Sequence, residues 1–340
     1  MYGFGSMLRD YLEFYKISQT EFAERLGVST KHVNKIINDQ ADISIELMLA
    51  ISLITDIDPN LILKLENQKK VNNYLLKKFK NEQNIKEFLN SFYIKEMIKL
   101  NWFKPKNITS YVQTSIDLLE YLKIKDFDVL DRYIENKVLY KKKDDANSKK
   151  VFLWIKRCDA LIKNIEIPLY NKNNLPLLLE ELKIERNKPF NEENIIKIFN
   201  KYGIYLVIEE ALNGTKIRGC TMVKENNPAI YMTKYFKEKS SFYFALYHEL
   251  GHVKTDYNKA KNKIIVYDDD LKEEEKQRDK FALNCMIEEK VWKQIIENPE
   301  GKEKLCKENK IPLCFLYTRL AYEGLISYKS KEYLSNREKI

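Results

Sequence analysis

Residues 242–252 read Phe242-Tyr243-Phe244-Ala245-Leu246-Tyr247-His248-Glu249-Leu250-Gly251-His252. On a helix, the apolar side chains of this run would lie on almost every side, which predicts a buried helix over about residues 240–256. His248 and His252 stand four residues apart and Glu249 follows the first, which is the HExxH pattern. The chain has three histidines in 340 residues, so this pattern rarely arises by chance. It indicates a metal site.

The spacing of the two histidines has a geometric reason. Four residues advance a helix by about 400° and about 6 Å, so both imidazoles point from one face and can hold one ion. Glu249 lies about 100° round the helix, close to the open position of the ion. The alternative is an exposed helix on which the side chains of the motif face solvent and bind no metal. We disfavour it because burying two histidines and a glutamate is costly unless a metal satisfies them.

A third ligand must come from elsewhere, because zinc in a catalytic site takes three protein ligands and a water. We expect a carboxylate from a helix over about residues 271–288. Glu275 is the predicted ligand, and Asp279 on the same stripe would accept a hydrogen bond from a ligand histidine. Glu274 competes for the ligand role, but its stripe includes Phe281, which should face the core. Zinc (Zn2+) is the expected metal, and manganese (Mn2+) or iron also suits these ligands.

A catalytic metal here would lower the pKa of its water, and Glu249 would accept a proton and pass it to the leaving amine. The strand expected at residues 229–232 could pair with an extended substrate by strand addition. The group that stabilises the oxyanion stays open among three residues: Tyr231, Arg319 and Tyr322.

Residues 6–67 predict five short helices, followed by a linker at about 67–72. Ser18 and Glu21 form a capping box for the second helix, which ends at Gly27. Three further side chains are suited to cap the next helices: Ser29, Ser44 and Asp58. Three apolar side chains share one face of the fourth helix: Ile45, Leu49 and Leu53. Residues 1–67 resemble an XRE-type helix-turn-helix domain.

The third of these helices, which ends at about Asn38, is expected to enter the major groove of double-stranded operator DNA. The side chains expected to contact the DNA are polar and exposed: Gln19, Thr30, Lys31, Asn34 and Lys35. Lysines suit phosphate or guanine, and asparagine suits adenine. His32 is expected beside the phosphate backbone or in solvent, not on a metal. Such domains read paired half-sites, so we expect a homodimer. The alternative is a helix-turn-helix used for protein contact.

Charge is unevenly distributed along the chain, whose net charge is +9. Residues 1–68 carry 6 Lys/Arg and 10 Asp/Glu, a net of −4. Residues 69–190 carry 26 and 16, a net of +10, and residues 191–340 carry 27 and 24, a net of +3. DNA affinity comes mostly from phosphate neutralisation. The positive charge for DNA binding must therefore come from the lysines of the third helix, from the basic middle region or from a second copy of the chain. A lysine-coated helical surface is nevertheless the more ordinary interpretation of the middle region.

Three parts are expected: a helix-turn-helix domain over 1–68, a helical middle region over 69–190, and a metal-binding domain over 191–340. The fold class is mainly α with a small α+β part. Strands are expected at 205–208, 217–223 and 229–232. The middle region has helix breaks at Lys104–Lys106 and in a lysine-rich loop over 141–150.

Composition points to a cytoplasmic protein. Hydrophobic residues make up 44% and charged residues 32%. No apolar run reaches the roughly 18 residues of a membrane span, so no membrane partner is expected. The N-terminus lacks the pattern of a secretory signal. The five cysteines are scattered without a CxxC pair, which indicates neither a disulfide framework nor a cysteine zinc site.

The run from Asn227 to His252 resembles the ImmA/IrrE family of metallopeptidases, and residues 278–282 are similar to that family's second motif. Residues 311–320 and 324–326 resemble its tail in versions fused to an N-terminal XRE-type helix-turn-helix, which are often labelled HigA-like antitoxins. The likeness covers residues 1–67 and about 190–340, and the middle region only loosely.

The resemblance implies a gluzincin-like fold, a zinc site and cleavage of a partner regulator, such as a repressor or a toxin-antitoxin component. It implies His248 and His252 as metal ligands, Glu249 as the catalytic base and Glu275 as the third ligand. The chain departs from the family pattern at three places: Arg278 instead of alanine, Asn284-Cys285-Met286-Ile287-Glu288 instead of Leu-Leu-Met/Ile-Pro, and Ala321-Tyr322 instead of glutamine-histidine. These departures bear on substrate handling more than on metal binding.

Two functions follow from these patterns. The first is a DNA-binding regulator whose zinc-dependent endopeptidase, active or latent, cleaves a repressor or toxin partner. The second is a DNA-binding antitoxin or autorepressor whose zincin-like domain is a sensing or partner-binding scaffold. The intact HExxH motif and the predicted third ligand favour the first.

Overall fold

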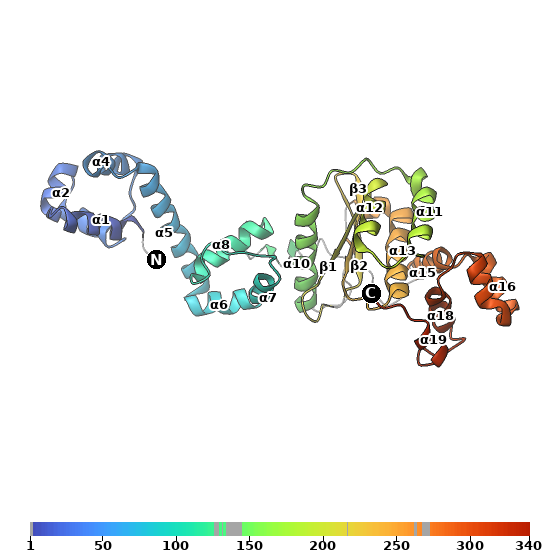
Figure 1. Cartoon of the computed structure of the whole chain (residues 1–340). Coiled ribbons are helices and arrows are strands. Elements are labelled where there is room, and N and C mark those ends of the chain that lie inside the picture. Colours follow the sequence, from blue (N-terminus) through green and yellow to red (C-terminus); the bar gives the residue numbers. More distant parts are fainter. Residues whose placement is uncertain are drawn as a thin grey trace. The chain divides into compact units, whose positions relative to one another are not determined.

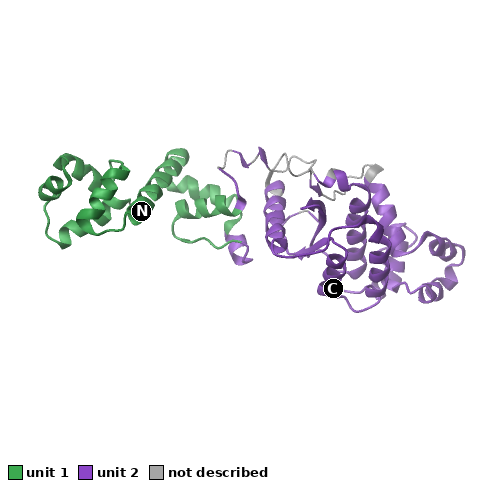
Figure 2. Ribbon diagram, turned by 90° about the horizontal axis from the view of Figure 1, so that it is seen from above, with its two compact units in different colours: residues 1–94, 103–121 green, residues 95–102, 122–340 purple. Residues whose placement is uncertain are grey.

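The computed structural model describes residues 3–125, 129–130, 132–133, 145–215, 217–261, 264–266 and 273–340. The chain forms two compact units, residues 1–94 with 103–121 and residues 95–102 with 122–340 (Figure 2). The predicted middle region, 69–190, is divided between these units instead of forming a third. No helix among the described residues has the length and apolar character needed to cross a bilayer.

The first unit is helical (Figure 1). Its elements, with α7 and the last residue of α8 reaching into the second unit, are α1 (Phe4–Phe14), α2 (Gln19–Leu26), α3 (Thr30–Ile37), α4 (Ile45–Thr55), α5 (Pro59–Phe79), α6 (Glu82–Asn90), α7 (Ile94–Lys99) and α8 (Tyr111–Leu122). The five predicted N-terminal helices are confirmed. The predicted linker at 67–72 is wrong, because these residues continue α5. They are mostly polar but include no glycine or proline to break a helix.

The predicted caps of these helices are confirmed. The side chains of Ser18, Ser29 and Ser44 each accept a hydrogen bond from a backbone N–H three residues on. Asp58 caps α5 by accepting from the N–H of Asn60. Gly27 ends α2 with φ 71°, a left-handed conformation that glycine adopts without strain.

The core of the first unit is built from apolar side chains of α1 to α5, including Phe4, Leu8, Phe22, Val33, Ile36 and Ile51. Helix α4 turns Met48 and Ile51 inward. The face shared by Ile45, Leu49 and Leu53 points outward instead, with 69%, 50% and 85% of these residues exposed. This helix is apolar nearly all round, so the sequence pattern alone could not show which face is covered.

The second unit is a small sheet with helices on both sides (Figure 1). Before the sheet come α10 (Asp145–Ile162), η1 (Lys172–Asn174), α11 (Leu175–Glu185) and α12 (Glu192–Lys201). The strands are β1 (Tyr205–Glu209), β2 (Gly219–Lys224), β3 (Asn227–Thr233) and β4 (Ile265–Val266). The other helices are α13 (Lys239–Thr255), α14 (Tyr257–Ala260), α15 (Glu273–Met286), α16 (Glu289–Glu297), η2 (Pro299–Gly301), α17 (Lys302–Glu308), α18 (Leu313–Tyr322) and α19 (Lys331–Ser335).

Two predictions for the middle region have different outcomes. Residues 104–106 lie in an irregular segment between α7 and α8, as predicted. The loop predicted over 141–150 is wrong for 145–150, which form the start of α10, because the lysines there are good helix formers. Residues 141–144 lie outside the described residues.

The strand order is β1-β3-β2-β4. Strand β3 pairs with β1 in parallel and with β2 antiparallel, and β2 also pairs with β4. The three predicted strands are confirmed as β1, β2 and β3. Strand addition at residues 229–232 is wrong, because both edges of β3 are already paired and no row of backbone groups is left for a substrate.

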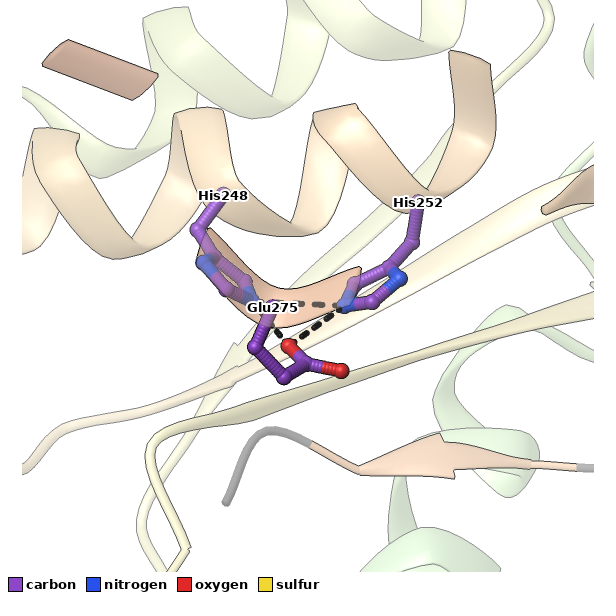
Figure 3. A group of neighbouring side chains, drawn as sticks. All are labelled: His248, His252 and Glu275. Atoms are coloured by element: carbon purple, nitrogen blue, oxygen red, sulfur yellow. Dashed lines mark hydrogen bonds and ion pairs between the residues drawn. The ribbon is translucent and has the colours of Figure 1, made fainter. Parts of the chain in front are cut away.

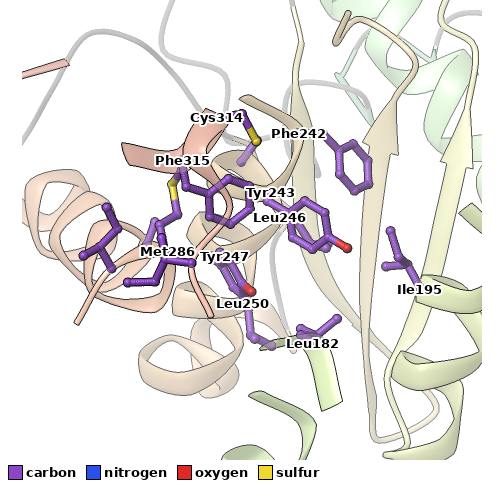
Figure 4. Packing of buried hydrophobic residues seen from close by; sticks show 14 of the residues in the cluster. Leu182, Ile195, Phe242, Tyr243, Leu246, Tyr247, Leu250, Met286, Cys314 and Phe315 are labelled. Atoms are coloured by element: carbon purple, nitrogen blue, oxygen red, sulfur yellow. The ribbon is translucent and has the colours of Figure 1, made fainter. Parts of the chain in front are cut away.

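The helix α13 covers one face of the sheet and α10 covers the other (Figure 1). Ile230 and Met232 of β3 share a buried core with Leu246 and Leu250 of α13, and other members of this core surround α13 (Figure 4). Tyr231, between them in β3, packs against Trp154 of α10 on the opposite face. The predicted buried helix carrying the HExxH motif is thus confirmed.

Candidate metal centre and helix-turn-helix

Three side chains from two helices converge at one point beneath α13. Figure 3 shows His248 and His252 of α13 pointing toward Glu275 of α15. Glu275 Oε2 lies 3.0 Å from His248 Nε2 and 3.4 Å from His252 Nε2, and the two Nε2 atoms are 3.2 Å apart. The structure therefore brings the three predicted ligand residues together. The side chain of the competing Glu274 lies outside the described residues.

The spacing of these atoms fits a bound metal ion. Ligand atoms held at about 2.0–2.1 Å by a tetrahedral ion lie about 3.3 Å from one another. The three atoms of this cluster fall close to that separation. Two imidazole nitrogens and one carboxylate oxygen are also a donor set that zinc takes in catalytic sites. These residues could thus hold a metal without rearrangement.

The electrostatics of the cluster reflect its burial. Burial alone would lower the pKa of His252, but hydrogen bonds to Asp256 and Glu275 outweigh it and raise the pKa to about 9. Burial would raise the pKa of Glu275, but hydrogen bonds to His248 and His252 outweigh it and lower the pKa to about 2. A negative carboxylate and a protonated imidazole thus compensate each other in the metal-free protein.

Each ligand histidine is oriented by a second carboxylate. Asp279 Oδ1 lies 2.8 Å from His248 Nδ1, which is the contact predicted from the sequence. Asp256 Oδ2 lies 2.9 Å from His252 Nδ1, a contact that the sequence reasoning missed. With Nδ1 donating to its carboxylate, Nε2 of each ring can present a lone pair to a metal once its own proton is released. The sequence could have indicated this contact, because Asp256 follows His252 by four residues, which is about one turn of a helix.

Arg278 of α15 supports this second contact. Its Nε and Nη2 donate to Asp256 Oδ2 at 3.0 Å and 2.5 Å. Burial would raise the pKa of Asp256, but the hydrogen bonds from His252 and Arg278 hold it well below its usual range. Gly251 makes room for this arrangement, since a Cβ there would lie 3.2 Å from Arg278 Cγ.

The carboxylate of Glu249 is buried beside the sheet. Thr221 Oγ1 of β2 donates to Glu249 Oε2 at 2.6 Å, and the sequence reasoning missed this residue. Oε1 is buried with no hydrogen-bond partner among the described residues. Burial raises the pKa of Glu249. A buried carboxylate with one oxygen fixed and the other unpartnered is suited to accept a proton from a water molecule.

The three residues considered for the oxyanion differ in position. Tyr231 donates to Asp159 at 2.8 Å on the far face of the sheet. Arg319 donates to the carbonyl of Ile287 at 2.7 Å. The expectation that Tyr231 or Arg319 stabilises the oxyanion is wrong, because both side chains make structural hydrogen bonds instead. The hydroxyl of Tyr322 lies 3.4 Å from Asp279 Oδ2, next to the cluster.

In the first unit, α2 and α3 form the helix-turn-helix. Four of the predicted contact residues are exposed on α3: Thr30, Lys31, Asn34 and Lys35. Gln19 at the start of α2 is half-buried, and its Oε1 accepts from Asn34 Nδ2 at 3.2 Å. Asn38 Nδ2 donates to Asn34 Oδ1 at 3.2 Å.

These amides form a chain that fixes the Asn34 side chain at the exposed side. Arg9 of α1, which the sequence reasoning missed, donates to Asn38 Oδ1 at 3.1 Å and adds a positive charge beside α3.

Comparison with known proteins supports the assignment of a helix-turn-helix in the first unit. A helix-turn-helix family model matches residues 8–62. No curated protein matches the chain, and no solved structure matches it. The first unit thus contains a helix-turn-helix domain, which supports DNA binding and a role in regulation.

Proposed function

We propose that the chain is a DNA-binding transcriptional regulator whose second unit is a zinc-dependent endopeptidase of the ImmA/IrrE type, which cleaves a partner regulator such as a repressor or a toxin-antitoxin component. The observation that carries the proposal is the buried cluster of His248, His252 and Glu275, with Glu249 beside it. The helix-turn-helix adds the DNA-binding half of the proposal.

In the proposed reaction, a bound zinc ion would supply Lewis acidity to a water and to the substrate carbonyl. Glu249 Oε1 accepts the proton of the attacking water and gives it to the leaving amine. Thr221 holds Glu249 Oε2, so the unpartnered oxygen keeps one direction. Asp279 and Asp256 keep the Nε2 atoms of the two histidines turned toward the ligand position.

A second candidate function is a non-proteolytic antitoxin or autorepressor that uses the same site as a metal-dependent scaffold. One observation favours it: His248, Glu249 and His252 are only 1%, 1% and 2% exposed. Structural zinc sites are closed, whereas catalytic sites keep an open position. Glu275, at 19% side-chain exposure, is the more accessible side of the cluster.

Operator binding as a homodimer belongs to the same proposal. The outward face of α4 carries Ile45, Leu49 and Leu53, three large apolar side chains in solvent. Such a stripe is self-complementary when two copies of a helix pack antiparallel. A second copy of this chain is the occupant we propose, because paired half-sites require two recognition helices.

Metal analysis combined with a proteolysis assay tests the peptidase. Purified protein is expected to hold about one zinc ion per chain and to cleave the product of the adjacent regulatory gene. Glu249→Gln is expected to keep the metal and lose cleavage. A purified protein without metal, or a Glu249→Gln variant as active as wild type, would contradict the proposed peptidase activity. Metal retention without cleavage by either protein would favour the scaffold.

A further inference from the structure

A cavity of 1050 Å³ adjoins the candidate metal centre in the second unit. It is lined by the segments that follow β1 and β3, by the first turns of α13, by α15 and α18, and by tyrosines of the C-terminal tail. One of its wall residues, Asp279, contacts the metal cluster, and a second, Phe244, lies near it in the chain. Phe244 precedes His248 by one turn of α13, and Asp279 bonds His248 Nδ1. The cavity is thus separated from His248 by the carboxylate that bonds His248 Nδ1.

The walls of this cavity are rich in aromatic rings. Phe244 and Tyr322 have ring centroids 5.7 Å apart, and Tyr328 and Tyr333 have centroids 5.1 Å apart. Tyr322 and Tyr328 are 47% and 49% exposed, and Tyr235 is 64% exposed. Large aromatic surface held in a concave site gains free energy when an apolar group covers it.

One wall of the cavity is long enough for a short extended segment. Along α13 its wall runs from Glu238 to Phe244, a rise of about 9 Å. This is the length of about three residues of an extended peptide, at about 3.3 Å each. Both signs of charge line the wall, as in neighbouring Lys237 and Glu238, so the cavity is not built for a polyanion.

We propose that this cavity is the subsite that selects the substrate, and that it takes an extended segment carrying a large aromatic or aliphatic side chain next to the bond at the metal. This inference rests on the proposed peptidase function and adds a substrate class to it. Selection by the cavity needs no strand addition to β3, whose edges are both paired.

Binding by the full chain carrying Glu249→Gln, loaded with zinc, separates recognition from cleavage. The probes are fluorescein-labelled decapeptides of glycine and serine with one central Phe, Leu, Ala or Asp. Fluorescence anisotropy is expected to give at least about tenfold tighter binding for Phe than for Ala, because the cavity buries the large apolar side chain. Equal affinities, or no measurable binding of the Phe peptide, would overturn the proposal.

Variants of the wall locate the binding. Tyr328→Ala is expected to weaken the Phe peptide about tenfold and leave the Ala peptide unchanged, whereas Tyr328→Phe keeps the ring and the affinity. Tyr74→Ala, at a comparably exposed tyrosine of α5, is the matched control and should change nothing. An unchanged affinity in Tyr328→Ala would overturn the assignment.

Cleavage by the unsubstituted protein distinguishes the proposed peptidase activity from the proposed subsite. If the protein binds the Phe peptide preferentially but cleaves none of the peptides, the subsite is supported and the peptidase activity is contradicted. Cleavage with no preference among the four central residues would retain the peptidase and overturn the subsite.

Discussion

Arg278 reaches from α15 to Asp256 at the end of α13 and donates two hydrogen bonds to one carboxylate oxygen. The same oxygen accepts the Nδ1 proton of His252. Arg278 therefore acts on the metal cluster through two other side chains.

Removing this support should weaken metal binding. Arg278→Ala leaves Asp256 without its cation, so His252 loses its fixed orientation, and zinc affinity is expected to fall about 10- to 100-fold. Competition with a chromogenic chelator measures the change. Lys280→Ala, an exposed lysine of the same helix, is the control. Wild-type affinity in Arg278→Ala would show that Asp256 is positioned without it.

Metal binding should depend on pH through His252. In the metal-free protein its pKa of about 9 lies above the unfolded value of about 6.5. The stability from this proton is fully present below about pH 6.5 and is lost as pH rises through about 9.

A metal must displace the same proton, so apparent affinity should rise with pH up to about 9. Calorimetry at pH 7 in buffers of different ionisation enthalpy should detect at least one proton released per ion. A release of zero would contradict this protonation state.

Thr221 should set the efficiency of Glu249. Thr221→Val keeps the shape but removes the hydroxyl, and a hydrogen bond to a charged group is worth about 1.5–3 kcal/mol. We expect kcat to fall at least about tenfold with zinc content unchanged, whereas Thr221→Ser retains most activity. If valine supports the wild-type kcat, Thr221 serves only the packing of β2 against α13.

DNA binding should depend on the exposed side of α3. Lys31→Ala combined with Asn34→Ala removes one phosphate or guanine contact and one adenine contact. Base contacts are worth about 1–3 kcal/mol each, so affinity for the protein's own promoter is expected to fall about 30-fold or more. An electrophoretic mobility shift at fixed salt measures it, with Lys70→Ala on α5 as the control. Unchanged binding would place the DNA contact elsewhere.

Self-association should depend on the outward face of α4. Leu49→Lys with Leu53→Lys puts two charges into the proposed pairing surface, and sedimentation is expected to show a monomer. Leu177→Lys, at a comparably exposed leucine of α11 (57%), should leave the dimer intact. A monomeric wild-type protein would exclude this surface as an interface.

Local features of the chain were predictable because neighbouring residues encode them. The caps at Ser18, Ser29 and Ser44 act within three residues, and their helices begin where expected. The HExxH spacing likewise acts within one turn of α13. The contact of Asp279 with His248 could be inferred from the stripe it shares with Glu275.

Features that depend on distant pairing were not predictable. Thr221 meets Glu249 only because β2 passes beneath α13, and nothing local marks that threonine. The apolar run over residues 229–232 indicates a strand but not which strands flank it, which is why strand addition was expected wrongly. Asp256 is one of 50 acidic residues in the chain, and its role appears only when α15 brings Arg278 to it.

The candidate ligands belong to two helices, with two from α13 and one from α15. An ion held by all three would join chain positions 252 and 275 as a reversible cross-link that the unfolded chain cannot form. By mass action, an ion present at about 1,000 times its Kd adds about 4 kcal/mol to the free energy of unfolding. The lifetime of this protein in a cell would then follow the supply of metal.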